Sequence, residues 1–203
     1  MPEDWETQWR RTWSNVPVWW SILWRGYKQL LKEVKLKSPR IMELGCGSGR
    51  TSLALAKLFK GEVTLVDNSK AAISKAKQVF HDQNINVKFI IGDLFSLKLK
   101  EGYDLVHSEG LIEHFQGETL TKLIKLHSLL CNPDGYVIIF APTPSKTYIL
   151  WRFIQERLGV WYYGDEKPML EDELKALCSD NGLNVLKSVK TPFQIGVLCQ
   201  PRR

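Results

Sequence analysis

Short apolar runs alternate with segments of helical periodicity through most of the chain. The apolar runs lie at residues 41–44, 63–66, 87–91, 103–107 and 136–140. Between them, residues 51–59, 70–83 and 119–130 repeat apolar side chains at the spacing of a helix face. Strands that are apolar at nearly every position are buried on both faces, so the pattern predicts a parallel α/β sheet covered by helices on both sides.

The C-terminal part shows a different pattern. A helix is predicted over residues 171–179 and is ended by Asn181-Gly182. Two further strands are predicted at residues 184–189 and 194–199, separated by a short turn at Thr191-Pro192. Because so short a connection joins antiparallel strands, the sheet is expected to close with an antiparallel hairpin.

Residues 1–38 precede the first predicted strand and are rich in tryptophan. Apolar rings recur there at helical spacing, first in Trp5, Trp9 and Trp13 and then, after Pro17, in Trp20, Trp24, Tyr27 and Leu31. The spacing predicts an N-terminal helical cap packed on the main domain, residues 39–203. Peripheral contact with a membrane surface is an alternative, because rings beside basic residues suit that interface.

Composition sets broad limits. The 203 residues are 44% hydrophobic and 25% charged, as in one soluble globular domain. The net charge of +6 is carried by scattered lysines, which favours a solvated surface over a nucleic-acid site. No signal-peptide pattern or bilayer-length apolar run is seen, and the cysteines form no C-x-x-C pair (Cys46, Cys131, Cys178, Cys199). A cytoplasmic location is therefore expected.

A glycine-rich turn follows the first predicted strand. Gly45, Gly47 and Gly49 stand at every second position, directly before the helix at residues 51–59. Glycine lets the backbone approach a ligand closely, and a strand–turn–helix unit directs free N–H groups above the turn. A dinucleotide site would need glycine where Arg50 stands, which argues against a nicotinamide oxidoreductase. The alternative is a purely structural role, as a tight turn between strand and helix that binds no ligand.

The segment Glu43-x-Gly45-x-Gly47-x-Gly49 resembles the first motif of class I S-adenosylmethionine (SAM)-dependent methyltransferases. A carboxylate at Glu43 suits the cationic amino end and sulfonium side of SAM, whereas it would repel a phosphate. The resemblance covers roughly residues 38–141 and implies the Rossmann-like methyltransferase sheet. It also implies a cofactor site that includes Cys46, with SAM as methyl donor and S-adenosylhomocysteine (SAH) as product.

The second predicted strand ends at another candidate position. In an open α/β sheet, ligands bind outside the carboxyl ends of the strands. Asp67, followed by Asn68, lies about 20 residues beyond the glycine turn, where a carboxylate is placed for the hydroxyls of a ribose. The alternative is that Asp67 caps the helix that begins near Lys70.

Gly92-Asp93-Leu94 follows the third predicted strand. Asp93 resembles the family position that binds the adenine amino group, with the next backbone N–H reaching a ring nitrogen. Ser108, after the fourth predicted strand, completes the implied cofactor set. Cofactor candidates thus follow four successive strands in the order of the family.

The loop at residues 108–115 resembles the one that floors the pocket beside the transferred methyl group in many small-molecule methyltransferases. His114 is the first candidate for a general base, because an imidazole titrates near neutral pH. Glu109 and Glu113 are second. A structural role in shaping the loop is the alternative for His114. No cluster of three carboxylate or histidine ligands is evident in the sequence, so no metal is expected.

Residues 141–168 depart from the minimal fold and are interpreted as an acceptor-side insertion. Aromatic residues crowd this segment: Tyr148, Trp151, Phe153, Trp161, Tyr162 and Tyr163. Tyr148 and Trp151 are predicted to contact the acceptor, with Trp20 and Trp24 as parts of a lid. Packing of Trp151 within its own helix is the alternative.

The resemblance implies in-line transfer of a methyl group from SAM to a small apolar or aromatic acceptor, first of all at oxygen or nitrogen. Base-amino methyltransferases carry an Asn/Asp-Pro-Pro-aromatic stretch where Ser108-Glu109-Gly110-Leu111 stands here, so nucleic acid is not an expected substrate. A protein methyltransferase and a catalytically silent SAM-binding subunit remain the alternatives. The sequence does not specify an oligomeric state.

Overall fold

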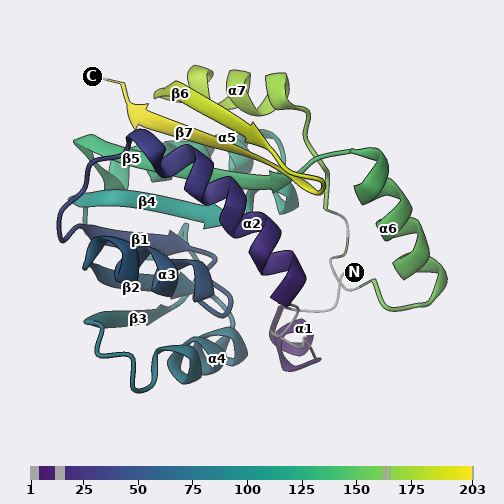
Figure 1. Ribbon diagram of the computed structural model, residues 1–203, viewed down its shortest axis with the longest axis horizontal. Coiled ribbons are helices and arrows are strands. Elements are labelled where there is room, and N and C mark those ends of the chain that lie inside the picture. The colour runs from purple at the N-terminus through teal and green to yellow at the C-terminus, as the bar shows by residue number, and fades with distance from the viewer. Residues whose placement is uncertain (1–4, 12–16, 162–163, 165, 203) are drawn as a thin grey trace.

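The computed structural model describes residues 5–11, 17–161, 164 and 166–202 and contains one seven-stranded sheet (Figure 1). The strand order is β3-β2-β1-β4-β5-β7-β6. The strands are β1 (Arg40–Leu44), β2 (Glu62–Asp67), β3 (Val87–Ile91), β4 (Tyr103–Glu109), β5 (Cys131–Pro142), β6 (Leu183–Lys190) and β7 (Gln194–Pro201).

The pairing confirms the predicted parallel sheet and terminal hairpin. β1 pairs in parallel with β2 on one side and β4 on the other, and β3 and β5 extend the parallel part. β7 pairs antiparallel with both β5 and β6. The strand order reverses beside β1, so a crevice is expected at the carboxyl ends of β1 and β4.

Helices cover both faces of the sheet (Figure 1). They are α1 (Trp5–Arg11), α2 (Pro17–Leu30), α3 (Arg50–Phe59), α4 (Lys70–Phe80), α5 (Gly117–Leu130), α6 (Lys146–Arg157) and α7 (Glu171–Asp180), with 3-10 turns η1 (Leu31–Glu33) and η2 (Ile112–His114). A hydrophobic core lies on each face of the sheet, and neighbouring β1 residues point into different cores. Ile41 belongs to the core with α2, α3 and α4, and Met42 to the core with α5 and α7.

Strands β4 and β5 continue past their predicted ends, toward the carboxyl edge of the parallel strands. Ser108 and Glu109 belong to β4, because they pair with Ile139 and Phe140 of β5. β5 in turn runs to Pro142, since β7 continues to pair with it there. The loop that follows β4 therefore begins at Gly110, and Glu109 is held by the sheet rather than by a loop.

The N-terminal helices pack against the domain at two places. In α2, the buried ring of Tyr27 stacks on Phe140 at 4.6 Å, and its hydroxyl contacts His107 Nδ1 at 3.1 Å. In α1, the Glu6 carboxylate accepts a hydrogen bond from the Ala71 N–H at the start of α4. Trp13 lies outside the described residues. None of the described helices combines the length and apolar character needed to cross a bilayer.

Candidate active site

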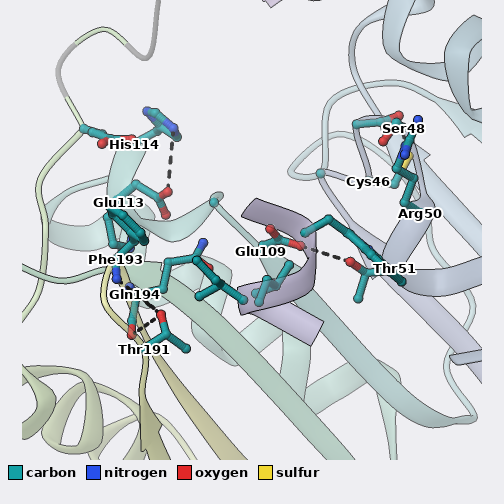
Figure 2. Close-up of a pocket in the computed structure, with 18 of the residues that line it drawn as sticks. Cys46, Ser48, Arg50, Thr51, Glu109, Glu113, His114, Thr191, Phe193 and Gln194 are labelled. Carbon is teal, nitrogen blue, oxygen red and sulfur yellow. Dashed lines mark hydrogen bonds and ion pairs between the residues drawn. The ribbon is translucent and has the colours of Figure 1, made fainter. Parts of the chain in front are cut away.

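A cavity of about 460 Å³ opens at the carboxyl ends of β1 and β4. Its walls come from the glycine turn after β1, the end of β4 with η2, helices α1, α2 and α6, and the turn between β6 and β7. Figure 2 shows Cys46, Ser48 and Arg50 at one end, Glu113 and His114 at the other, and Glu109 between them.

The glycine turn has the backbone that only glycine tolerates well. Gly45 and Gly47 have φ values of +64° and +51°. A Cβ on Gly45 would lie 2.7 Å from the Leu111 side chain, and one on Gly47 would lie 2.4 Å from the ring of Trp9. Both glycines line the cavity together with Cys46, so close approach of the backbone explains the glycine spacing.

Glu43 is the buried acid at the glycine end. It is only 3% exposed, and its Oε2 atom has no hydrogen-bond partner among the described residues. Burial raises the pKa of Glu43 well above its usual value, with a hydrogen bond from Ser52 opposing the shift. His107 Nε2 lies 3.9 Å away but supplies no charge, because burial lowers the pKa of His107 to about 3.

This arrangement fits a cationic ligand. A buried carboxyl group with one unpartnered oxygen favours a ligand that brings positive charge and a donor. The amino end of SAM carries both, and Glu43 lines the same cavity as Gly45 and Gly47. The residues present therefore fit the cofactor that the sequence motif implies.

Asp67 fastens the glycine turn to β2. Its Oδ2 accepts from the Gly47 N–H and its Oδ1 from the Ser69 N–H, both at 2.9 Å. The side chain that caps α4 is that of Ser69, which accepts from Ala72 N–H. The capping alternative for Asp67 is therefore wrong: Asp67 holds the glycine turn, and its contact with a ribose stays a prediction.

None of the nucleoside candidates, Asp67 included, is among the residues that line this cavity. Asn68 and Asp93 are exposed, and the Asp93 carboxylate accepts from Ser96 Oγ. Leu94, which follows Gly92, packs into the core beside β4 and α5. In this structure α1 lies across the glycine turn, with Trp5, Gln8 and Trp9 facing the cavity.

Ser108 faces away from the cavity, contrary to the sequence-based prediction. It is fully buried, and its hydroxyl contacts His127 Nε2 of α5 at 2.9 Å. Side chains alternate between the faces of a strand, so His107 and Glu109 point to the α2–α3 face while Ser108 points to α5.

Glu109 sits at the middle of the cavity. Thr51 Oγ1 donates to its Oε2 at 3.1 Å. Burial raises the pKa of Glu109 to about 7, while hydrogen bonds from Thr51 and Gln194 act in the opposite direction. A carboxyl group that titrates near neutral pH is suited to accept a proton from a substrate.

Aromatic side chains line the end of the cavity where the sequence predicts an acceptor, here called the acceptor end. Trp20, Tyr148 and Trp151 line the cavity, and their contact with an acceptor stays a prediction. Trp24 does not, because it lies within α2 between the rings of Trp20 and Tyr27, at 5.8 and 6.2 Å. Tyr162 and Tyr163 lie outside the described residues.

The structure adds lining residues that the sequence did not single out. Thr191, Phe193 and Gln194 come from the turn between β6 and β7. Since β7 runs antiparallel to β5, that turn lies at the same edge of the sheet as the carboxyl ends of the parallel strands. The predicted hairpin could have indicated these lining residues, because its short turn lies at the carboxyl edge of the parallel strands.

A cluster of titratable groups also appears at the acceptor end. Ligating atoms of Glu113, His114 and Glu166 lie within 4.8 Å of one another. The sequence-based statement that no such cluster is evident is thereby corrected. Glu166 is remote from η2 in sequence and reaches it because the Lys167 N–H donates to the Glu113 carbonyl at 3.1 Å.

Residues 41–135 match a family described as "Methyltransferase domain". The chain is 40% identical over 115 residues to the malonyl-[acyl-carrier protein] O-methyltransferase of Bacillus cereus, covering 55% of this chain and 40% of that protein. It is 31% identical over 121 residues to the ribosomal protein L11 methyltransferase of Thermosipho melanesiensis, covering 59% of this chain and 44% of that protein. The chain therefore spans less than half the length of these curated relatives.

A solved structure extends the similarity over nearly the whole chain. Magnesium protoporphyrin IX methyltransferase from Synechocystis PCC 6803, solved with bound SAH, matches with a TM-score of 0.70. The match covers 97% of this chain and 94% of the other at 19% sequence identity. At that identity the likeness shows a shared fold.

Proposed function

We propose that this chain is a class I SAM-dependent methyltransferase and that it transfers the methyl group of SAM to a small acceptor with an aromatic or apolar body. The observation that carries the proposal is the cavity itself. Glu43 with its unpartnered oxygen, Glu109 with a pKa near 7, and the rings of Trp20, Tyr148 and Trp151 all face the same space.

Bound SAM supplies a methyl group that its sulfonium already activates. The work left to this chain is placement and handling of a proton. Glu43 would hold the cationic amino end, the glycine turn would lie against the cofactor, and the rings would orient the acceptor, because all of them line one cavity. Near-attack placement of this kind contributes roughly 7–11 kcal/mol to lowering the barrier.

A base is needed when the acceptor atom must lose a proton. We propose Glu109 for this step, because it lies between the two ends of the cavity in Figure 2 and its pKa is raised to about 7. His114, at the acceptor end, is the alternative base. Its ring and that of Trp5 form a T-shaped pair with centroids 4.7 Å apart. Transfer to oxygen or nitrogen fits either residue.

The dimensions of the site favour a small molecule over nucleic acid. The cavity holds about 460 Å³ and is bordered by α1 and α6 rather than by an open basic groove. The four cysteines are all buried free thiols, which supports the proposed cytoplasmic location. Protein methylation and a silent SAM-binding role are outcomes that the following experiment and acceptor screening distinguish.

Calorimetric titration with SAH tests the cofactor assignment, with NADH as the control ligand. We expect SAH to bind and NADH not to bind, because the site offers a carboxylate and a glycine turn without the final glycine of a dinucleotide site. Release of SAH in acceptor screens with labelled SAM then tests turnover. Binding of neither ligand would contradict the proposed function.

The substitution Asp67→Ala should weaken SAH binding by roughly 1–3 kcal/mol, from loss of a hydrogen-bonded carboxylate. The physical reason is that Asp67 holds the Gly47 N–H, and with it the turn. Calorimetry measures the loss, and circular dichroism checks the fold. Asp93→Ala serves as the comparison. Weaker SAH binding in Asp93→Ala, with unchanged binding in Asp67→Ala, would contradict the role proposed for Asp67.

A further inference from the structure

The acceptor end of the cavity contains three groups of the kinds that bind metal ions. Glu113 and His114 are neighbours in η2, and Glu166 lies in the segment between α6 and α7. Their ligating atoms lie within 4.8 Å of one another, and all three residues line the cavity. His114 Nε2 is 4.0 Å from Glu113 Oε1, the pair joined by a dashed line in Figure 2.

The burial of Glu113 is a second, independent observation. The residue is 2% exposed, and its Oε2 atom has no hydrogen-bond partner among the described residues. A carboxyl group removed from water to this extent normally has a partner that satisfies both oxygens. An ion held between Glu113, His114 and Glu166 would satisfy the unpartnered oxygen.

The surroundings hold these groups in place. The Lys167 N–H donates to the Glu113 carbonyl at 3.1 Å, which ties the segment carrying Glu166 to η2. The Tyr148 hydroxyl donates to Glu166 Oε1 at 2.6 Å, and Arg152 in turn donates to the Tyr148 hydroxyl. Hydrogen bonds of this kind orient the carboxylates of metal sites.

We propose that Glu113, His114 and Glu166 bind one divalent cation at the acceptor end of the cavity. The two carboxylates balance the +2 charge of the ion. The ion in turn offsets the free-energy cost of burying both acids in their charged form. The imidazole distinguishes this set from the all-oxygen sites that Mg²⁺ and Ca²⁺ prefer, and favours an ion such as Mn²⁺, Fe²⁺ or Zn²⁺.

The cation also specifies the acceptor, and this part of the inference rests on the proposed function. A divalent ion binds the oxygen of a hydroxyl group and lowers its pKa. Glu109, in the same cavity, takes the hydroxyl proton. The oxygen then forms a bond to the methyl carbon as the carbon–sulfur bond breaks. The electron pair of the carbon–sulfur bond stays on the sulfur, which is neutral in SAH. The inferred acceptor is therefore a hydroxyl-bearing aromatic compound.

Titration of the chelator-stripped full chain with Mn²⁺, followed by electron paramagnetic resonance, tests the site without catalysis. Binding to the wild type is expected, and Glu113→Gln and Glu166→Gln should each weaken it at least tenfold. Tyr148→Phe should weaken it by a smaller factor, because Tyr148 only orients Glu166. Glu118→Gln is the matched control: it removes an exposed acid of α5 outside the cluster, and it should change Mn²⁺ affinity less than threefold. Zn²⁺ is tested by its competition with Mn²⁺ and by calorimetry.

Equal Mn²⁺ affinity in the wild type and both glutamine variants would overturn the proposal, as would binding of neither Mn²⁺ nor Zn²⁺ to the wild type. Titration with SAH in the absence of metal checks the fold of each variant and separates the two proposals. Binding of SAH without either metal would leave the proposed function standing and the cation site rejected. Binding of metal without SAH would do the reverse.

Discussion

Glu43→Gln is expected to weaken SAH binding by about 2–3 kcal/mol, a loss of roughly 30–150-fold. The reason is that the unpartnered Oε2 of Glu43 is a buried acceptor in the cofactor end of the cavity, where a ligand ammonium completes it. Glutamine keeps the shape but removes the charge. Calorimetry with SAH measures the effect, and SAM should lose at least as much affinity because it carries an additional positive charge.

The same substitution should not lower the stability of the ligand-free protein. Burial raises the pKa of Glu43 above its usual value of 4.5, so the folded state binds a proton more tightly than the unfolded state. The free energy of unfolding therefore falls as the pH rises above about 4.5, and Glu43→Gln should reduce this decrease. Denaturant titrations at several pH values measure it, with exposed Glu118→Gln as the matched control.

Unchanged SAH affinity in a folded Glu43→Gln protein would contradict the assignment of Glu43 to the cofactor. A large loss of stability at pH 7 would contradict the electrostatic account instead, because it would mean that the charged form of Glu43 is stabilised in the folded protein. The two measurements thus test the ligand contact and the buried charge separately.

Glu109→Gln is expected to lower turnover by about 10²–10⁴-fold, the usual contribution of a general base, and to leave SAH affinity nearly unchanged. The base acts when it is deprotonated. With a pKa near 7 for Glu109, wild-type turnover should rise with pH through neutrality and then level off. Initial rates across pH 5.5–8.5, with an acceptor found by screening, should show this rise in the wild type and not in the variant.

Thr51→Val provides a finer test of the same residue. Thr51 donates a hydrogen bond to Glu109 and thereby lowers its pKa, so removing the hydroxyl should move the rise in turnover to higher pH. Movement to lower pH would contradict the assignment. If the rise persists in Glu109→Gln and disappears in His114→Asn, the base is His114.

Local sequence determined the frame of this protein. Apolar runs and helical periodicity are local properties of the chain, and they predicted that the first five strands form a parallel sheet and that the last two form an antiparallel hairpin. The glycine turn could also be predicted from the sequence. Gly45 and Gly47 have positive φ values, which other residues adopt only at an energetic cost. The same motif identified Glu43 as the acid beside the turn.

The contents of the cavity were decided by contacts between distant segments. The end of β4 depends on pairing with β5, which placed Glu109 in the sheet and turned Ser108 toward His127. The position of Glu166 depends on a backbone hydrogen bond to Glu113, for which the sequence carries no local pattern. Hydrophobic periodicity specifies which face of an element is buried, whereas the packing of strands and loops decides which polar groups meet at the sheet edge.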